Sequence, residues 1–191
     1  MITVPEALGK ILNSAKQLDT INLPIEEVLN YYLVDDITAD RAIPPFNRVA
    51  MDGFAVQSSD FQNCTEKEFQ IIGHIQTGVS SDLIVTSGTA VQIMTGAPCP
   101  AGADSVVKIE DAEIKGDIVK LVADKIGPGT NVAAMGEDAA EGKILIEAGS
   151  LLSTSGIAIC ASVGKAIVEV YRKPKIKVIS TGTEIIPPHE Q

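Results

Sequence analysis

The hydrophobic positions at the start of the chain repeat with the spacing of an α-helix. From Ala7 to Ala15 they recur three or four residues apart, which predicts an amphipathic helix over residues 4–17. Thr3 and Glu6 form a capping-box pattern just before this stretch, with a proline close behind the cap. The pattern therefore predicts both the apolar face and the first turn of this helix.

A second helical pattern follows, and the chain then changes character. A stripe of apolar residues between Ile25 and Leu33 predicts a helix that begins at Pro24, whereas Pro44 and Pro45 require an extended segment. Beyond them, short β-like runs alternate with Gly, Pro, Asp and Ser, which favours a compact β domain, a small barrel or sandwich, over βαβ units. The predicted strands are 69–72, 88–94, 103–109, 118–122 and 143–146, with a tight turn at 115–117.

The last part of the chain again mixes helix and strand signals. Ser153 is a good N-cap for a short helix that ends near Gly164. A strand is predicted over 166–171, followed by a basic, proline-containing hinge at 172–175. Residues 176–182 predict a further strand that runs into a glycine-containing loop. Ligands collect at such strand ends in open α/β sheets, so this loop is a candidate binding segment.

Length and charge restrict the class of protein. At roughly 150 residues per domain, 191 residues make one large domain or two small ones. A net charge of −10 argues against a protein that binds nucleic acid through phosphate contacts, and against adhesion to anionic lipid. The start of the sequence does not resemble a signal peptide, and no run reaches the ~18 apolar residues of a membrane span. We therefore expect a cytoplasmic protein.

Cysteine and histidine usage excludes several kinds of site. The three cysteines Cys64, Cys99 and Cys160 are an odd number at long spacings, which does not suit a disulfide framework or a zinc site. Two histidines are too few for a multi-histidine metal site within this chain. We interpret all three cysteines as reduced thiols, and Cys99 as structural.

Five polar segments are candidates for chemistry, and each also has a structural explanation. Asp52-Gly53 is a common turn pair, and 95–98 has the composition of a strand end and loop. Glu110-Asp111 suits a solvated end before a hairpin. Glu137-Asp138 suits either a water or Mg²⁺ site or plain surface charge. Glu184, after a predicted strand and glycine turn, is the best placed for binding, but these spacings alone do not name a reaction.

Longer strings within the same segments resemble one known family. The runs 43–56 (IPPFNRVAMDGFAV) and 93–107 (IMTGAPCPAGADSVV) resemble two signatures of the MoeA/gephyrin E-domain family, the molybdopterin molybdenumtransferases. The run from Asn131 through Gly136-Glu137-Asp138, with the later glycine-containing segments, is similar to a third region. Residues 179–184 (ISTGTE) resemble the strand and loop that open the family's pterin-binding domain. The resemblance extends over essentially the whole chain.

The resemblance implies a fold and a domain order. It implies an α+β, multi-domain protein with an elongated, discontinuous dimerisation domain at 1–45 and 140–172. A β-barrel-like domain at 46–139 is expected to be inserted in it. Residues 173–191 are expected to be the first strand and loop of an α/β molybdopterin-binding domain that is truncated here. We therefore expect the 191 residues alone neither to bind molybdopterin nor to insert molybdenum.

The resemblance also implies a reaction and its partners. Such enzymes insert molybdate into adenylylated molybdopterin and release AMP, with a divalent cation such as Mg²⁺. The family resemblance further implies a homodimer, with a molybdopterin adenylyltransferase as a possible upstream partner. Two alternatives stay open: a non-catalytic dimerisation or scaffold module of the same family, and a stand-alone molybdate-binding protein. The choice between molybdate and tungstate is also open.

Candidate site residues follow from the resemblance, position by position. It implies catalytic roles for Asp52, Thr95, Asp138 and Glu184, with a metal-binding role for Glu184 and with the Thr95 hydroxyl able to hold an oxyanion. It implies binding of the pterin substrate by Thr95, Ser180 and Gly182. Stabilisation of loops by side-chain hydrogen bonds to the backbone is the alternative role for the four catalytic candidates. Two departures from the family pattern are Arg48-Val49, where many members carry Asn-Ser, and Thr183, which replaces an acidic residue.

Overall fold

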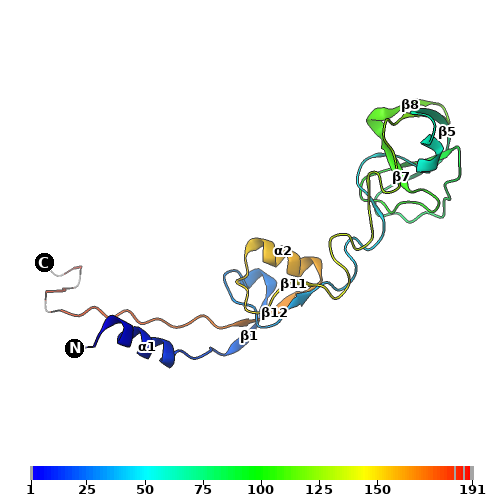
Figure 1. Ribbon diagram of the computed structural model, residues 1–191. Coiled ribbons are helices and arrows are strands. Elements are labelled where there is room, and N and C mark those ends of the chain that lie inside the picture. The colour runs from blue at the N-terminus through cyan, green and yellow to red at the C-terminus, as the bar shows by residue number, and fades with distance from the viewer. Residues whose placement is uncertain (1, 183, 187, 190–191) are drawn as a thin grey trace. The chain divides into compact units, whose positions relative to one another are not determined.

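The computed structural model describes residues 2–182, 184–186 and 188–189 and divides into two compact units (Figure 1). The first unit comprises residues 1–37 and 145–191, and the second comprises residues 38–144. The second unit is therefore inserted in the sequence of the first. The sequence predicted the same kind of nesting with boundaries at 45/46 and 139/140, and that assignment of domains stays a prediction.

The first unit combines two helices with a two-stranded sheet. Thr3 caps the first helix as predicted, since the Glu6 amide donates to Thr3 Oγ1 at 3.4 Å and the Thr3 amide donates to Glu6 Oε2 at 2.8 Å. Ser153 caps the second helix through the Gly156 amide at 3.2 Å. The elements are α1 (Val4–Ser14), β1 (Thr20–Pro24), the 3₁₀ helix η1 (Ile25–Glu27), α2 (Thr154–Ser162) and β12 (Ile167–Tyr171), with β1 antiparallel to β12. Both helix starts predicted from local capping signals are thus confirmed.

The helix predicted from Pro24 through Leu33 is wrong. Only the single 3₁₀ turn of η1 forms, and Asn30 then adopts the left-handed conformation with φ 61°. The next residues extend, because Tyr32 bridges to Leu151 and Leu33 bridges to Val170. Of the apolar side chains in the supposed helical stripe, Val28 and Leu33 are fully buried in this unit, whereas Leu29 and Tyr32 are exposed.

The second unit is built on one mixed sheet of six strands, in the order β7-β4-β6-β5-β9-β8. All its neighbouring pairs are antiparallel except β5 and β6, which are parallel. Figure 1 shows this sheet curled on itself; a closed barrel stays a prediction. The strands are β4 (Gly53–Val56), β5 (Glu66–Ile75), β6 (Thr89–Ile93), β7 (Ser105–Lys108), β8 (Ala112–Lys115) and β9 (Ile118–Val122).

Shorter elements connect this sheet to the rest of the chain. The 3₁₀ helices are η2 (Ser58–Phe61) and η3 (Ile109–Asp111), and β3 (Arg48–Val49) pairs with β10 (Val132–Ala133). Where the chain passes between the units, β2 (Ile37–Thr38) pairs with β11 (Ile144–Ile146). No helix within the described residues is long and apolar enough to cross a bilayer.

Both faces of the central strands are buried. Ala55 and Val106 belong to one hydrophobic cluster, whereas their sequence neighbours Phe54 and Val107 belong to another. Successive side chains of a strand point to opposite faces, so each cluster covers one side of the sheet. All four residues of β4 are buried for this reason, and the strand lacks the alternation by which half-buried strands are recognised.

Most of the other predicted strands are confirmed within a few residues. The hairpin between β8 and β9 turns at Gly116, whose φ of 62° suits the glycine, as the 115–117 turn predicted. The strand predicted over 176–182 is wrong, since these described residues form no strand pairing. A strand needs a neighbouring strand to satisfy its backbone groups, and this segment has none within the described chain.

A buried carboxylate ties two loops of the second unit to β5. Asp60 accepts hydrogen bonds from Lys67 Nζ and Ser87 Oγ, both at 2.6 Å, and from the Gly88 amide at 3.1 Å. Its side chain is only 4% exposed. Burial alone would raise the pKa of Asp60, but these hydrogen bonds and the Lys67 charge lower it overall.

We expect Asp60→Asn to destabilise the protein by about 1–3 kcal/mol at pH 7, because an amide cannot satisfy three donors. The folded pKa lies below the ordinary value, so the carboxylate's contribution is present above about pH 4 and is lost as the pH falls through the folded pKa. Urea denaturation at pH 7 and in acid tests this, with Asp82→Asn, at an exposed position, as control. The expectation would be contradicted if the free energy of unfolding differed between Asp60→Asn and wild type as much in strong acid as at pH 7.

Candidate functional site

Two strand ends bring the two longest sequence motifs together. Asp52 immediately precedes β4, and Thr95 follows β6 by two residues. β4 and β6 are antiparallel, with Gly53 opposite Ile93, so the start of one strand adjoins the end of the other. Asp52 Oδ1 accepts hydrogen bonds from both the amide and the hydroxyl of Thr95, each at 2.7 Å. Residues 43 positions apart in sequence thus form one polar contact.

Asp52-Gly53 is not a turn, because Gly53 is the first residue of a strand. A Cβ on Gly53 would collide with the carbonyl oxygen of Val107 on the neighbouring strand β7. Glycine is therefore required here for close approach of two backbones rather than for a left-handed turn. The pairing that this glycine permits fixes the position of Asp52.

The loop after β6 is held against the first motif by its backbone. Gly96 has φ 87°, and its amide donates to the Val49 carbonyl at 2.8 Å. The Val49 amide in turn donates to the Ala97 carbonyl at 3.0 Å. Thr77 Oγ1 adds a hydrogen bond to the Thr95 carbonyl at 2.6 Å. These bonds hold the loop so that the Thr95 side chain lies against the Asp52 carboxylate.

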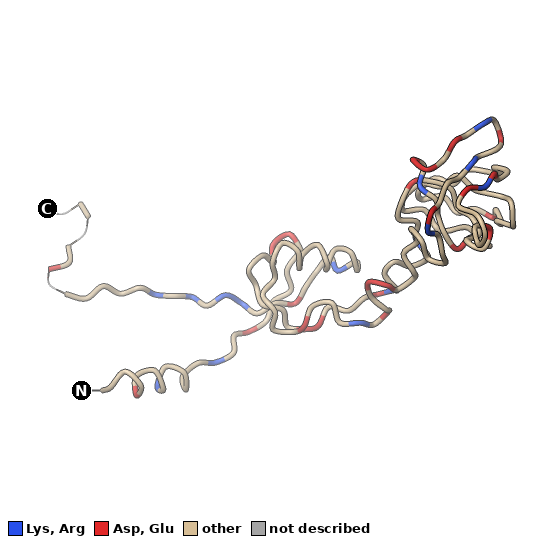
Figure 2. Tube along the Cα trace, turned by 45° about the horizontal axis from the view of Figure 1, so that its top comes forward, with Lys and Arg blue, Asp and Glu red and all other residues tan. Residues whose placement is uncertain are grey.

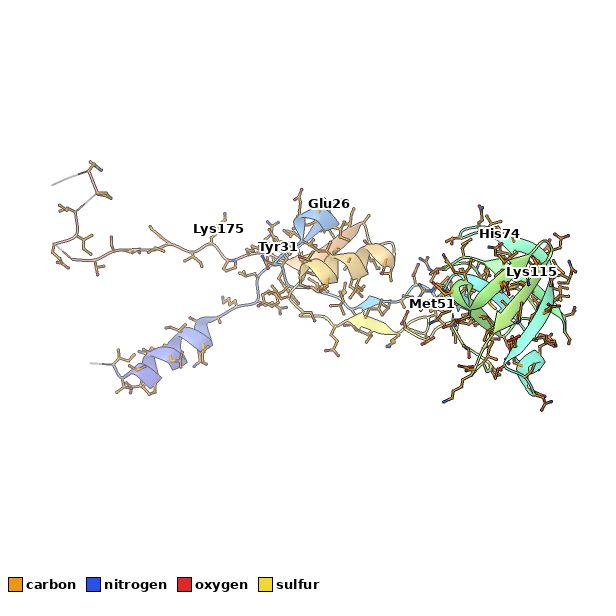
Figure 3. All side chains as sticks on the ribbon, turned by 90° about the horizontal axis from the view of Figure 1, so that it is seen from above. Glu26, Tyr31, Met51, His74, Lys115 and Lys175 are labelled. Carbon is orange, nitrogen blue, oxygen red and sulfur yellow. The ribbon has the colours of Figure 1, made fainter. Side chains whose placement is uncertain are left out.

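A cavity of about 440 Å³ opens beside this pair. Lys108, the last residue of β7, lies opposite Gly53, and the Ile109 amide donates to the Asp52 carbonyl at 3.0 Å. This bond anchors η3, so its acidic residues lie at the cavity. Figure 3 labels Met51, which also lines it. The full lining is Met51, Asp52, Thr95, Lys108, Glu110 and Asp111.

Glu110 and Asp111 were not predicted as site residues. Their sequence signal indicated a solvated strand end, and both side chains are indeed exposed. The available clue was their position directly after the second motif, which ends at Val107. Only the pairing of β7 with β4 shows that the residues after Val107 lie beside Asp52.

The hydrogen bonds from Thr95 favour the ionised form of Asp52. The Thr95 hydroxyl contributes most and the Thr95 amide next, and together they lower the pKa of Asp52 despite a small opposing effect of desolvation. A hydroxyl has one proton, and that of Thr95 is directed at Asp52 Oδ1. The geometry therefore leaves Asp52 Oδ2 as the oxygen available to a ligand, with the carboxylate charged at neutral pH.

The other predicted site residues do not line this cavity. Asp138 is exposed, its amide donates to the Ile43 carbonyl at 2.9 Å, and neighbouring Glu137 accepts from the Ala134 amide at 2.9 Å. Glu137 thus stabilises a loop. Ser180, Gly182 and Glu184 belong to the first unit and are exposed, while Thr183 is outside the described residues. Their functional roles stay predictions.

The described residues do not group into a metal site. Among them, no three His, Cys, Asp or Glu side chains are placed to hold an ion. The carboxyl of Glu184 lies against Gly182. The described residues therefore do not by themselves form a site for the Mg²⁺ that the family resemblance implies, and Mg²⁺ stays a prediction.

Cys99, in the loop beyond Thr95, has the character of a structural thiol. Burial raises its pKa to about 11, with a smaller effect of the Asp104 charge, and its Sγ contacts the Ala103 carbonyl at 3.7 Å. A thiol reacts as its thiolate, so a raised pKa lowers its reactivity. The structural interpretation of Cys99 agrees with this environment.

Comparisons with known proteins point to one family. A family model described as the MoeA N-terminal region (domain I and II) matches residues 2–164. The molybdopterin molybdenumtransferases of Staphylococcus aureus (strain MSSA476) and Staphylococcus epidermidis (strain ATCC 12228 / FDA PCI 1200) are each 35% identical over 188 residues, covering 97% of this chain and 45% of theirs. A crystal structure of the molybdopterin biosynthesis moeA protein from Pyrococcus horikoshii OT3 aligns with a TM-score of 0.85 and 31% identity, over 91% of this chain and 47% of that one. This chain thus spans less than half the length of these relatives.

We expect Thr95→Val to raise the pKa of Asp52, because it removes the hydroxyl that contributes most to stabilising the carboxylate. Thr95→Ser keeps the hydroxyl and is expected to retain the lowered pKa. The measurement is an NMR pH titration of the Asp52 carboxyl carbon in each variant. Equal Asp52 pKa values in wild type and Thr95→Val would show that the hydroxyl does not stabilise the charge.

Proposed function

The chain belongs to the MoeA family, and from that premise we propose that its protein takes part in molybdenum cofactor biosynthesis by inserting molybdate into adenylylated molybdopterin with release of AMP. The family match, and the names of the relatives that are 35% identical over 97% of this chain, support this proposal. The observation that carries it is the meeting of Asp52 and Thr95, from two separate motifs, at one cavity. A scaffold alone would not require a charged side chain with an oxygen available to a ligand at this cavity.

The environment of Asp52 supports an orienting role for its carboxylate in the proposed reaction. Its lowered pKa makes it a weak base, so it orients a water molecule or a hydroxyl of the reacting groups rather than abstracting a proton. Asp52 Oδ2 accepts the hydrogen bond of the water that attacks the phosphoanhydride phosphorus. The water oxygen bonds to the adenylyl phosphorus, and the bond from that phosphorus to the bridging oxygen breaks. The bridging oxygen leaves with the pterin phosphate and the water proton passes to solvent, which yields AMP and molybdopterin. Thr95 holds the carboxylate in this orientation.

Asp138, Ser180, Gly182 and Glu184 complete the proposal as substrate contacts in the assembled enzyme. They lie outside the Asp52 cavity, and any divalent cation in the reaction needs ligands beyond those that the described residues group together. We assign no step to a metal on this chain. The contribution of the chain's own residues is to orient water and to hold the substrate.

The apolar face of α1 supports a homodimer as part of the same proposal. The helix has no buried residue, and Val4, Leu8, Ile11 and Leu12 are 82%, 53%, 65% and 64% exposed. These residues recur at helical spacing, so they form one face, and a contiguous exposed apolar face marks an interaction surface. A second copy of the chain is the occupant we propose. This surface would equally serve the alternative of a non-catalytic dimerisation or scaffold module.

A chimera tests the enzymatic proposal. We expect the S. aureus relative to retain AMP release from adenylylated molybdopterin and molybdate when this chain replaces the part that it matches. Asp52→Asn in that chimera is expected to lower the rate at least ~100-fold, as when a charge-stabilising or orienting group is removed from an active site. The matched control is Asp82→Asn, an exposed carboxylate outside the cavity.

Two results would reject the enzymatic proposal in favour of the scaffold alternative. One is a folded chimera that releases no AMP. The other is an Asp52→Asn chimera as active as its parent. Circular dichroism and solution mass establish folding independently of activity in each case.

For the dimer, we expect light scattering to give twice the 20.1 kDa mass of the chain. Leu8→Glu is expected to weaken association at least ~10-fold, because it places a charge within the apolar face of each copy. Asn13→Glu adds the same charge outside the apolar set and is expected to leave the dimer intact. A wild-type chain that is monomeric at micromolar concentration would contradict the assignment.

A further inference from the structure

One of the residues that line the Asp52 cavity is basic. Of its six lining residues, Asp52, Glu110 and Asp111 are acidic and Lys108 alone is basic. The chain as a whole carries a net charge of −10. An anionic ligand entering this cavity therefore meets repulsion from three carboxylates and attraction from one lysine.

Strand pairing holds the backbone of Lys108, whereas no hydrogen bond or ion pair within the described residues holds its side chain. Lys108 ends β7 and pairs with Gly53 of β4, and the following Ile109 amide is bonded to the Asp52 carbonyl. In the part of the chain that the structure describes, no hydrogen bond or ion pair engages Lys108 Nζ, even though three carboxylates line the same cavity. The ammonium group is exposed and can turn to a ligand without breaking an existing ion pair.

Lys108 also belongs to a second cavity beside the first. This cavity has a volume of about 400 Å³ and shares Lys108 and Asp111 with the Asp52 cavity. Its own polar lining comprises Asp124, Lys125, Thr130 and Asn131. Lys108 thus lies where the two hollows adjoin, within reach of an extended ligand that occupies both. Figure 2 shows basic and acidic positions interspersed over this unit rather than one broad basic surface.

We propose that Lys108 is a specificity-determining residue that contacts the phosphate groups of the nucleotide portion of the substrate. A lysine ammonium is a compact, hydrated charge on a flexible stem, well suited to a phosphate oxygen. It selects charged, phosphorylated ligands over uncharged analogues in a cavity that otherwise repels anions. This inference rests on the proposed function, since it names the part of the substrate that this cavity recognises.

The test uses the chain itself with ADP as a phosphoanhydride probe and adenosine as its uncharged counterpart. Titrations are followed by the amide resonances of Gly53, Gly96 and Ile109 in ¹⁵N–¹H spectra. We expect ADP to shift these resonances, adenosine to shift them much less, and Lys108→Gln to weaken ADP binding about tenfold. Lys108→Arg keeps the charge and is expected to retain affinity within about threefold. Added salt is expected to weaken wild-type binding more than that of Lys108→Gln.

Lys125→Gln is the matched control, because it removes the same charge from the second cavity alone. It is expected to weaken ADP binding much less than Lys108→Gln does. Unchanged spectra away from β7 establish that each variant is folded. The inference is overturned if Lys108→Gln binds ADP as wild type does, if adenosine binds as tightly as ADP, or if wild type gives no shift up to about 10 mM ADP.

These outcomes are separable from the fate of the proposed function. If the Asp52→Asn chimera loses AMP release while Lys108→Gln binds ADP normally, the enzymatic proposal stands and the Lys108 assignment fails. If the chain binds ADP through Lys108 but the folded chimera releases no AMP, the phosphate site stands and the enzymatic proposal fails.

Discussion

The pairing of β4 with strands on both of its edges is the constraint on which the candidate site depends. Its first residue, Gly53, lies opposite Ile93 of β6 on one side and Lys108 of β7 on the other. The side-chain-free glycine lets the β7 backbone approach closely. Asp52, Thr95 and η3 therefore meet at one end of a strand whose side chains are buried on both faces.

Elements with local signals were predictable from the sequence. Thr3, Ser153 and Gly116 each act through residues only two or three positions away, so their caps and turn appear in the sequence itself. The segment after Pro24 shows the opposite case. Its apolar spacing suited a helix, but bridges from Tyr32 and Leu33 to residues more than a hundred positions away determine its conformation.

Some residues at the candidate site could be selected from the sequence, whereas others were found only from the strand pairing. Asp52 and Thr95 stand in long motifs, and their motif context was sufficient to select them. Glu110 and Asp111 are ordinary surface carboxylates in sequence, and only the register of β7 against β4 brings them to the same cavity. Asp138 and Glu184 were selected by motif as well, but Asp138 is not among the residues that line the Asp52 cavity, and Glu184 belongs to the first unit.

Because Asp52 and Thr95 flank paired core strands, occupancy of the cavity is thermodynamically linked to the folding of the second unit. A ligand that binds only the folded state stabilises it by RT ln(1 + [L]/Kd), or about 2.7 kcal/mol at a hundredfold excess over Kd. Ligand present during synthesis would accordingly enlarge the folded fraction of newly made chains. Cellular abundance of the protein would then rise with the supply of that ligand.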